Sequence, residues 1–247
     1  MRLLTFSVLR NYKLKSFFFT HPKRLYSGVI QSKLDVKSGD TSLVEISETW
    51  KAEEEPDLRA AVLRDMQVFP DFVTEEEEQS MLAELEPYLK RMRYEFDHWD
   101  NAIQGYRETE KSKWSPENQI ILDRVKALAF APGSGSGEPL PHAHVLDLAG
   151  AGHIKPHIDA VRFCGDVIAG VCLVSGAVMR LAHAQKPHLV LDALLARRAL
   201  YIMKGCARYS FSHAVLGADE SVWKGRKVQR LRRVAVICRS QPHPQNK

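Results

Sequence analysis

The stretch VIAGVCLVSGAVMRLAH (167–183) decides the fold class of this chain. It holds two short runs of β-branched and other apolar residues, and Ser175–Gly176 between them marks a tight turn. Such runs recur after residue 141 as HAHVLDLA (142–149), ALYIMK (199–204), ARYSFSH (207–213) and RVAVICR (233–239). Six or more short strands separated by turn residues predict an antiparallel sheet folded into a β-sandwich or jelly roll.

Two helices are expected before this β-rich region. FVTEEEEQSMLAELEPYLK (72–90) begins with Thr74 as a helix cap, and Glu77 completes a capping box. SPENQIILDRVKALAF (115–130) begins in a similar way, with Ser115 as the cap and a proline at the first helical position. The sequence therefore predicts an α+β chain in which two N-terminal helices precede the β core.

The N-terminal residues have the composition of an import signal. Residues 1–34 contain Lys and Arg but neither Asp nor Glu, and RLYS (24–27) resembles a matrix-protease site. We expect residues 1–26 to be a mitochondrial presequence and the mature protein to lie in the matrix. A basic tail that binds nucleic acid or a membrane is the alternative. Because the presequence is so basic, the net charge of +5 does not by itself indicate a nucleic-acid-binding protein.

The remaining boundaries follow from composition. We expect a flexible linker over the polar, aperiodic residues 27–60, one domain over 61–240 and a tail over 241–247. The four cysteines form no CxxC pair, so reduced thiols are expected rather than disulfides or a zinc site. No apolar run reaches the roughly 18 residues that a membrane span requires. We expect a monomer.

A metal site is indicated by HIKPHIDAVRFCG (153–165). In an extended chain residues i and i+2 point the same way, so His157 and Asp159 would face a common point. His213 is the best third ligand, because two histidines and one carboxylate form the facial triad of non-haem Fe(II) oxygenases. A surface hairpin end with ordinary polar residues is the alternative. The competing histidines are His142, His144, His153, His183 and His188.

A co-substrate site is indicated by RVAVICR. Three protein ligands leave three positions of an octahedral iron open, which suits a 2-oxo acid that chelates through two oxygens, with O2 at the third. The second carboxylate of 2-oxoglutarate calls for a planar, two-pronged arginine. Arg233 and Arg239 are six residues apart and therefore lie on one face of a strand. An edge strand with solvated arginines is the alternative.

The order of these motifs resembles the AlkB family of Fe(II)/2-oxoglutarate-dependent dioxygenases. The shared features are an HxD motif, a distal histidine and an R-x5-R strand that begins at Arg233. YIMKGCARYSFSH (201–213) resembles the family segment that carries a co-substrate tyrosine and the distal histidine, and the likeness covers residues 66–240. The resemblance implies an oxidoreductase with a double-stranded β-helix (jelly roll) core.

The resemblance also assigns site residues. It implies Fe(II) bound by His157, Asp159 and His213, with no further catalytic side chain beyond this metal centre. Arg233 and the Tyr201 hydroxyl would bind the distal carboxylate of 2-oxoglutarate. Arg239 would line the same pocket, where it either touches the co-substrate or steadies Asp159. O2 is the other co-substrate.

The substrate remains open between several classes. AlkB-like proteins act on alkylated DNA or RNA bases and on protein side chains. The sequence has no clear counterparts of the aromatic residues with which DNA-repairing members stack a base, so we expect hydroxylation of a mitochondrial protein rather than DNA repair. Demethylation of methylated RNA bases is one alternative, and a non-catalytic AlkB-like binding module is another.

Fusing residues 1–40 to a fluorescent reporter is expected to send the reporter to mitochondria and to yield a product cleaved after Tyr26, because the basic run ends in a processing motif. Imaging and N-terminal sequencing of the reporter measure both events. The control fusion carries residues 27–40 alone. A reporter that stays in the cytosol with the full segment contradicts the presequence prediction.

Overall fold

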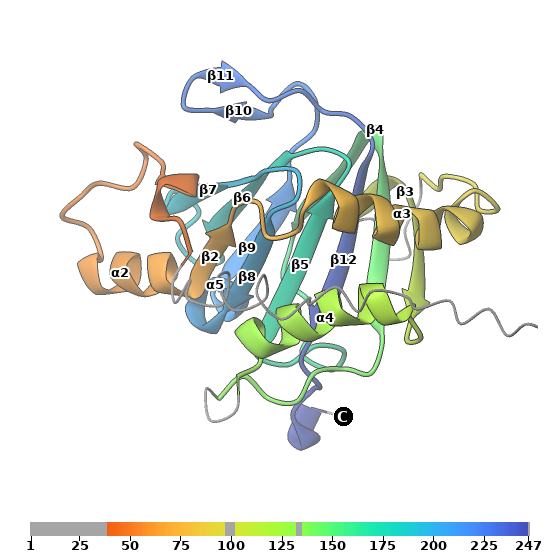
Figure 1. Ribbon diagram of the computed structural model, residues 1–247. Coiled ribbons are helices and arrows are strands. Elements are labelled where there is room, and N and C mark those ends of the chain that lie inside the picture. The colour runs from red at the N-terminus through yellow and green to blue at the C-terminus, as the bar shows by residue number, and fades with distance from the viewer. Residues whose placement is uncertain (1–38, 97–101, 132–134, 247) are drawn as a thin grey trace, which may run out of the picture. The chain divides into compact units, whose positions relative to one another are not determined.

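A computed structural model describes residues 39–96, 102–131 and 135–246, so the predicted presequence and the first part of the predicted linker lie outside the described residues (Figure 1). The helical elements are η1 (Thr41–Leu43), α2 (Pro56–Asp65), α3 (Glu75–Leu89), α4 (Pro116–Ala129), α5 (Gly205–Tyr209) and η2 (Pro244–Asn246). The strands are β1 (Val44–Ile46), β2 (Met66–Phe69), β3 (Ile103–Lys111), β4 (Ala143–His157), β5 (Val167–Leu173), β6 (Ala177–His183), β7 (Val190–Leu195), β8 (Leu200–Lys204), β9 (Phe211–Val215), β10 (Val222–Trp223), β11 (Arg226–Lys227) and β12 (Arg233–Arg239).

One antiparallel sheet forms the core of the fold. Its strand order is β1-β7-β6-β9-β4-β12-β5-β8-β2, and β3 pairs with β4. The two ends of this order nearly meet, because the Asp40 N–H next to η1 donates to Val68 O of β2 at 2.8 Å. Gly39 permits this approach, since a Cβ there would lie 2.8 Å from Val68 N. The sheet is therefore a nearly closed barrel of jelly-roll type, which confirms the predicted fold class.

The strand β12 separates two hydrophobic clusters. Val234 and Val236 pack in the cluster that includes the apolar residues of α3 and α4, while Ala235 and Ile237 pack in the cluster inside the barrel. Figure 1 shows α3 and α4 lying across the strands β5 and β12. Because side chains alternate along a strand, the arginines at the two ends of β12 are on the barrel side. The predicted two-faced strand is confirmed.

The two predicted helix starts are also confirmed. The Thr74 hydroxyl accepts from the Glu77 N–H at 3.2 Å, and the Glu77 carboxylate accepts from the Thr74 N–H at 2.9 Å, which is a complete capping box. At α4 the Ser115 hydroxyl accepts from the Asn118 N–H at 3.3 Å. Among the described residues no helix combines the length and the apolar character that crossing a membrane requires.

Residues 39–60 contain more structure than the predicted flexible linker. The short strand β1 pairs with β7, with Val44 opposite Ala193. The helix α2 begins at Pro56, where proline is well tolerated because its missing N–H would have no helical partner. A strand of three residues is too short to show an alternation of apolar and polar side chains in the sequence. The strand β1 is ordered because it pairs with β7, which is distant in sequence. Consequently three helices, rather than two, precede β4.

The segment ARYSFSH is wrongly predicted as a single strand. Its first residues belong to the helix α5, and β9 begins only at Phe211. The Asp65 carboxylate at the end of α2 accepts from the Cys206 N–H at 2.9 Å and so satisfies the first turn of α5. This contact is tertiary and leaves no local signal. His213 therefore lies in the middle of β9 rather than at the end of a strand.

The strands β3 and β7 were not predicted from the sequence. The strand β3 contains the charged run RETEK and lies at an edge, where it pairs with β4 alone. Charged side chains are common on edge strands and hide the apolar alternation. The strand β7 has a mixed pattern because it pairs with β6 on one side and only the short β1 on the other.

A buried carboxylate connects the sheet to the helix layer. Asp147 of β4 is fully buried and accepts from Arg107 Nε of β3 at 2.7 Å and from Arg232 Nη2 at 2.7 Å. The Tyr94 hydroxyl donates to the same carboxylate at 3.1 Å. A buried charge with two cationic partners is tolerated only while all three remain together.

Asp147→Asn is expected to lower the free energy of unfolding by about 3–5 kcal/mol, because it removes the buried counter-charge of Arg107 and leaves Arg232 with Glu86 of α3 as its acidic partner. The matched control is Asp192→Asn in the Arg180–Asp192 pair (2.8 Å), whose arginine is 44% exposed. A partly exposed pair of this kind contributes at most about 1 kcal/mol. Urea denaturation measures both values, and equal losses would contradict the special position of Asp147.

Candidate metal centre

Three side chains converge at the end of β4. His157 is the last residue of β4 and is paired in register with His213 of β9, while Asp159 follows two residues later. The Asp159 Oδ1 atom lies 3.2 Å from His157 Nε2 and 3.8 Å from His213 Nε2. The ligand atoms of all three residues lie within 4.8 Å of one another, in the only such group of three found among the described residues. The predicted triad is therefore brought together in space.

The two imidazoles are suited to metal binding. His157 Nδ1 donates to the carbonyl of Lys155 at 2.9 Å, so the proton is on Nδ1 and the lone pair of Nε2 faces the triad. Burial, together with the neighbouring His157, lowers the pKa of His213 to about 3. His213 is thus neutral at physiological pH, as a metal ligand must be. Its buried Nδ1 has no hydrogen-bond partner among the described residues.

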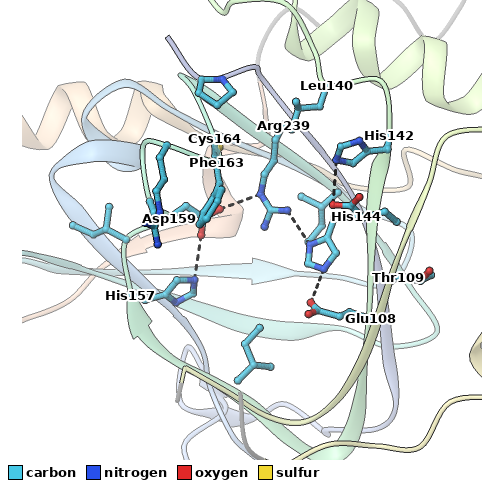
Figure 2. A pocket seen from close by; sticks show the side chains of 17 residues that line it. Glu108, Thr109, Leu140, His142, His144, His157, Asp159, Phe163, Cys164 and Arg239 are labelled. Atoms are coloured by element: carbon cyan, nitrogen blue, oxygen red, sulfur yellow. Dashed lines mark hydrogen bonds and ion pairs between the residues drawn. The ribbon is translucent and has the colours of Figure 1, made fainter. Parts of the chain in front are cut away.

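The carboxylate of Asp159 is held by an arginine on its far side. Arg239 Nε donates to Asp159 Oδ2 at 3.1 Å (Figure 2). Burial alone would raise the pKa of Asp159, but its close contact with the His157 ring and the charge of Arg239 outweigh burial and hold that pKa well below its usual range. The group is therefore ionised. Two neutral imidazoles and one carboxylate on one side of a cavity fit Fe(II) with open coordination positions.

His157 and Asp159 of the triad line a pocket of about 840 Å³. Beyond the triad, one wall comes from β3 and the start of β4, where Glu108 pairs with His144 at 2.7 Å and Glu110 pairs with His142 at 3.2 Å. Figure 2 shows His144 between Arg239 and Glu108. Apolar residues complete the lining: Ile103, Leu140, Ile158, Phe163, Ile237 and Pro242. Pro242 belongs to the predicted tail, so the tail contributes to the pocket.

Arg233 and Tyr201 are not part of this pocket lining and lie deeper in the barrel. Arg233 is 2% exposed, and its Nη2 lies 3.3 Å from the sulfur of Cys172. Its Nε has no hydrogen-bond partner within the part of the chain that the structure describes. Burial raises the pKa of Tyr201 to about 12, so its hydroxyl remains a donor. The Tyr201 ring lies directly beside Gly170, where a Cβ would come within 2.4 Å of the ring.

The competing histidines are excluded from the triad, but two of them matter for the pocket. His183 accepts from the backbone N–H of Lys186, and His188 contacts Glu54, both away from the pocket. His142 and His144, by contrast, line it. Sequence reasoning missed their acidic partners on β3. The signal that was available is the spacing of HAH (142–144) and ETE (108–110), since residues i and i+2 of a strand share a face.

Relatives of known name share most of the chain. No protein-family model matches. The Mus musculus protein named alpha-ketoglutarate-dependent dioxygenase alkB homolog 7, mitochondrial, is 53% identical over 175 residues, which is 71% of this chain and 78% of the relative. The Bos taurus protein of the same name is 51% identical over 187 residues, or 74% of this chain and 83% of the relative.

Solved structures of low identity share the fold. A Pseudomonas putida prolyl-4-hydroxylase has a TM-score of 0.53 at 13% identity, covering 72% of this chain and 93% of its own. A prolyl hydroxylase from Trichoplax adhaerens, in complex with a hypoxia inducible factor peptide fragment, has 0.53 at 14%, covering 79% and 94%. OsALKBH1 has 0.51 at 13%, covering 72% and 97%. At these identities the likeness concerns the fold alone.

Gly170→Ala is expected to lower the free energy of unfolding by about 1–3 kcal/mol, because the new methyl group would overlap the Tyr201 ring. The control Gly150→Ala, whose nearest contact would be 3.7 Å, should have no cost. Urea denaturation measures both. In a Tyr201→Ala background the cost of Gly170→Ala should disappear, and an unchanged cost there would contradict the steric explanation.

Proposed function

The chain belongs to the alkB homolog 7 family of alpha-ketoglutarate-dependent (2-oxoglutarate-dependent) dioxygenases, and from this premise we propose that it hydroxylates a C–H bond of a protein side chain in the mitochondrial matrix. Membership in this family implies Fe(II), 2-oxoglutarate and O2. The observation that carries the proposal is the His157–Asp159–His213 triad, two of whose residues line a pocket with apolar residues at its rim.

In this proposal the triad binds Fe(II) on one face. The centre couples oxidation of 2-oxoglutarate by O2, which gives succinate and CO2, to insertion of one oxygen atom into a substrate C–H bond. His157 contributes Nε2, because its Nδ1 proton is held by the Lys155 carbonyl. Asp159 contributes Oδ1, because Arg239 holds its other oxygen. Three protein ligands leave room for a two-oxygen chelate and O2.

Arg233 and Tyr201 are proposed to bind the distal carboxylate of 2-oxoglutarate. A buried guanidinium without an anionic partner is costly, and Arg233 has no ion-pair partner among the described residues. Burial and the charge of Arg233 also lower the pKa of Arg230 to about 10, so two cations act on this region. A dianionic co-substrate would supply the missing charge, and the protonated Tyr201 hydroxyl would add a neutral hydrogen bond.

The pocket rim supports a polypeptide substrate. Ile158, Val161 and Phe163 are exposed on the segment after His157, and Phe163 is 57% exposed. The opposite wall carries Glu108 and Glu110, whose carboxylates would repel a phosphate backbone.

Exposed basic residues lie both at the pocket, where Arg162 contributes to the lining, and elsewhere on the described chain. The exposed Lys224, Arg226 and Lys227 of the β10–β11 hairpin line a separate surface and do not contribute to the pocket. A nucleic-acid substrate would be expected to meet basic side chains beside the metal centre. Among the described lining residues one exposed arginine, Arg162, stands beside the two carboxylates of Glu108 and Glu110, a balance of charge that favours a protein substrate over RNA.

The proposed matrix location rests on the N-terminal composition and on the names of the relatives, which include the word mitochondrial. Residues 1–26 are proposed as the import signal. The four cysteines of the chain are free, as expected for a reducing compartment.

Arg233→Ala is expected to weaken 2-oxoglutarate binding by roughly 10- to 150-fold, because a charge-assisted hydrogen bond contributes about 1.5–3 kcal/mol. Arg233→Lys should restore part of the affinity, since an ammonium cannot make the two-pronged contact. Tyr201→Phe should cost less. Titration of 2-oxoglutarate into anaerobic Fe(II) protein, read from the charge-transfer band, measures each value. The control is Arg180→Ala on the surface of β6, and a loss of affinity there equal to that of Arg233→Ala contradicts the assignment.

His157→Ala, Asp159→Ala and His213→Ala should each abolish Fe(II)-dependent succinate formation without unfolding, because each removes one of three protein ligands. The control is His188→Ala, a histidine outside the pocket. To identify the substrate, cells lacking the protein are supplied with the wild type or with Asp159→Ala. Mass spectrometry should find a protein side chain that is hydroxylated only with the wild type. A difference confined to methylated RNA bases would overturn the proposed substrate class.

A further inference from the structure

We propose that His144 and Glu108 are positioning residues of the metal centre, which act through Arg239 to fix the orientation of the Asp159 carboxylate, so that one of its oxygens faces the two histidines. The inference rests on the proposed function, because it takes Asp159 as a metal ligand. Neither His144 nor Glu108 would touch the metal. Their effect is on the geometry of the carboxylate.

The two oxygens of Asp159 have different partners. Oδ1 faces His157 Nε2 at 3.2 Å, whereas Oδ2 accepts from Arg239 Nε at 3.1 Å. A carboxylate divided in this way presents one oxygen to the metal position. A quarter-turn about the Cβ–Cγ bond would move both oxygens away from these partners and break the contact with Arg239, whereas a half-turn gives an equivalent arrangement because the two oxygens are identical. The orientation of Arg239 therefore determines the orientation of Asp159.

Arg239 is itself held from the opposite side. Its Nη1 lies 2.8 Å from His144 Nδ1, and His144 Nε2 lies 2.7 Å from Glu108 Oε2. A guanidinium can only donate, so His144 Nδ1 must be the acceptor and carry the lone pair. The proton of the neutral ring is then on Nε2 and is donated to Glu108. The chain of hydrogen bonds has a single direction, from Arg239 through His144 to Glu108 (Figure 2).

The strand register places His144 where it can connect these groups. It lies on β4, opposite Ile237 of β12 on one side and opposite Glu110 of β3 on the other. Arg239 and Glu108 are each two residues from these partners and share their faces. The side chain of His144 is 17% exposed, and that of Arg239 is 22% exposed. Contacts in such a partly enclosed position are screened less by water than surface pairs.

The same wall of the pocket carries a second histidine–glutamate pair, which serves as a comparison. His142 and Glu110 are two residues away from His144 and Glu108, and their Nε2–Oε1 distance is 3.2 Å. They line the same pocket, but no contact joins them to Arg239 among the described residues. If a histidine–glutamate pair on this wall mattered only for folding or local charge, the two pairs should behave alike.

The test compares Fe(II) affinity in four variants: His144→Leu, His144→Gln, Glu108→Gln and the control His142→Leu. Affinity is measured anaerobically by competition with a chromophoric chelator. The charge-transfer band that forms on adding 2-oxoglutarate reports the ligand geometry. Removing a residue that orients a metal ligand typically costs 10- to 100-fold in affinity, and we expect this range for His144→Leu together with a shifted band.

The other variants test the hydrogen bonds that His144 forms with Arg239 and Glu108. His144→Gln should restore most of the affinity, because its amide oxygen can accept from Arg239 while its NH2 donates to Glu108. Glu108→Gln keeps the shape and loses the charge, so a loss of about three- to tenfold is expected. His142→Leu should stay within about twofold of the wild type.

Each outcome is decisive. Wild-type affinity and an unshifted band in folded His144→Leu overturn the inference, as does an equal loss in His142→Leu. Should His144→Leu fail to fold, Glu108→Gln decides instead, and an unchanged affinity there overturns the inference. A wild-type protein that binds no Fe(II) overturns the proposed function itself, which separates the two failures.

Discussion

The alternation of side chains along β12 is the constraint on which the rest of the structure depends. Its even-numbered residues are apolar and hold α3 and α4 against the sheet, while its odd-numbered residues face the barrel interior. The same alternation sends Arg233 and Arg239 to the interior at opposite ends of the strand. A shift of one residue would place both arginines under the helices and the valines in the barrel. Packing of the helix layer therefore fixes the register on which the site depends.

The two faces of the sheet differ in how their buried charges are compensated. On the helix side, Asp147 is fully buried and has Arg107 and Arg232 as partners, so the charges compensate one another within the protein. On the barrel side, Arg233 is equally buried and has no ion-pair partner among the described residues. Leaving a buried charge without its partner costs about 3–5 kcal/mol. The charged cluster around Asp147 stabilises the fold, whereas the burial of Arg233 is explained by the proposed binding of 2-oxoglutarate.

The metal centre depends on contacts from four strands and one loop. His157 and His213 are opposite one another on β4 and β9, and Asp159 lies just beyond β4. Arg239 of β12 restrains Asp159, and His144 of β4 restrains Arg239 together with Glu108 of β3. Rigid strands hold such groups more accurately than loops do. The apolar residues that surround the pocket mouth leave space for a substrate beside a carboxylate whose orientation is already determined.

The sequence by itself determined the jelly-roll class, the capped helices α3 and α4, and the two-faced strand β12. These features have local signals: a period of two, capping residues at fixed spacing, and turn residues between apolar runs. The sequence also predicted His157, Asp159 and His213 as metal ligands, because HxD places two ligands on one side of an extended chain. Features that depend on pairing between distant segments could be seen only in the tertiary structure. The charged edge strand β3 forms because it pairs with β4, and residues 41–60 are ordered because β1 pairs with β7. The helix α5 begins where the Asp65 carboxylate accepts from a backbone N–H. The link from Glu108 through His144 and Arg239 to Asp159 joins four sites in the sequence, and no local pattern encodes it, since hydrogen bonds between distant strands exist only once the sheet has closed.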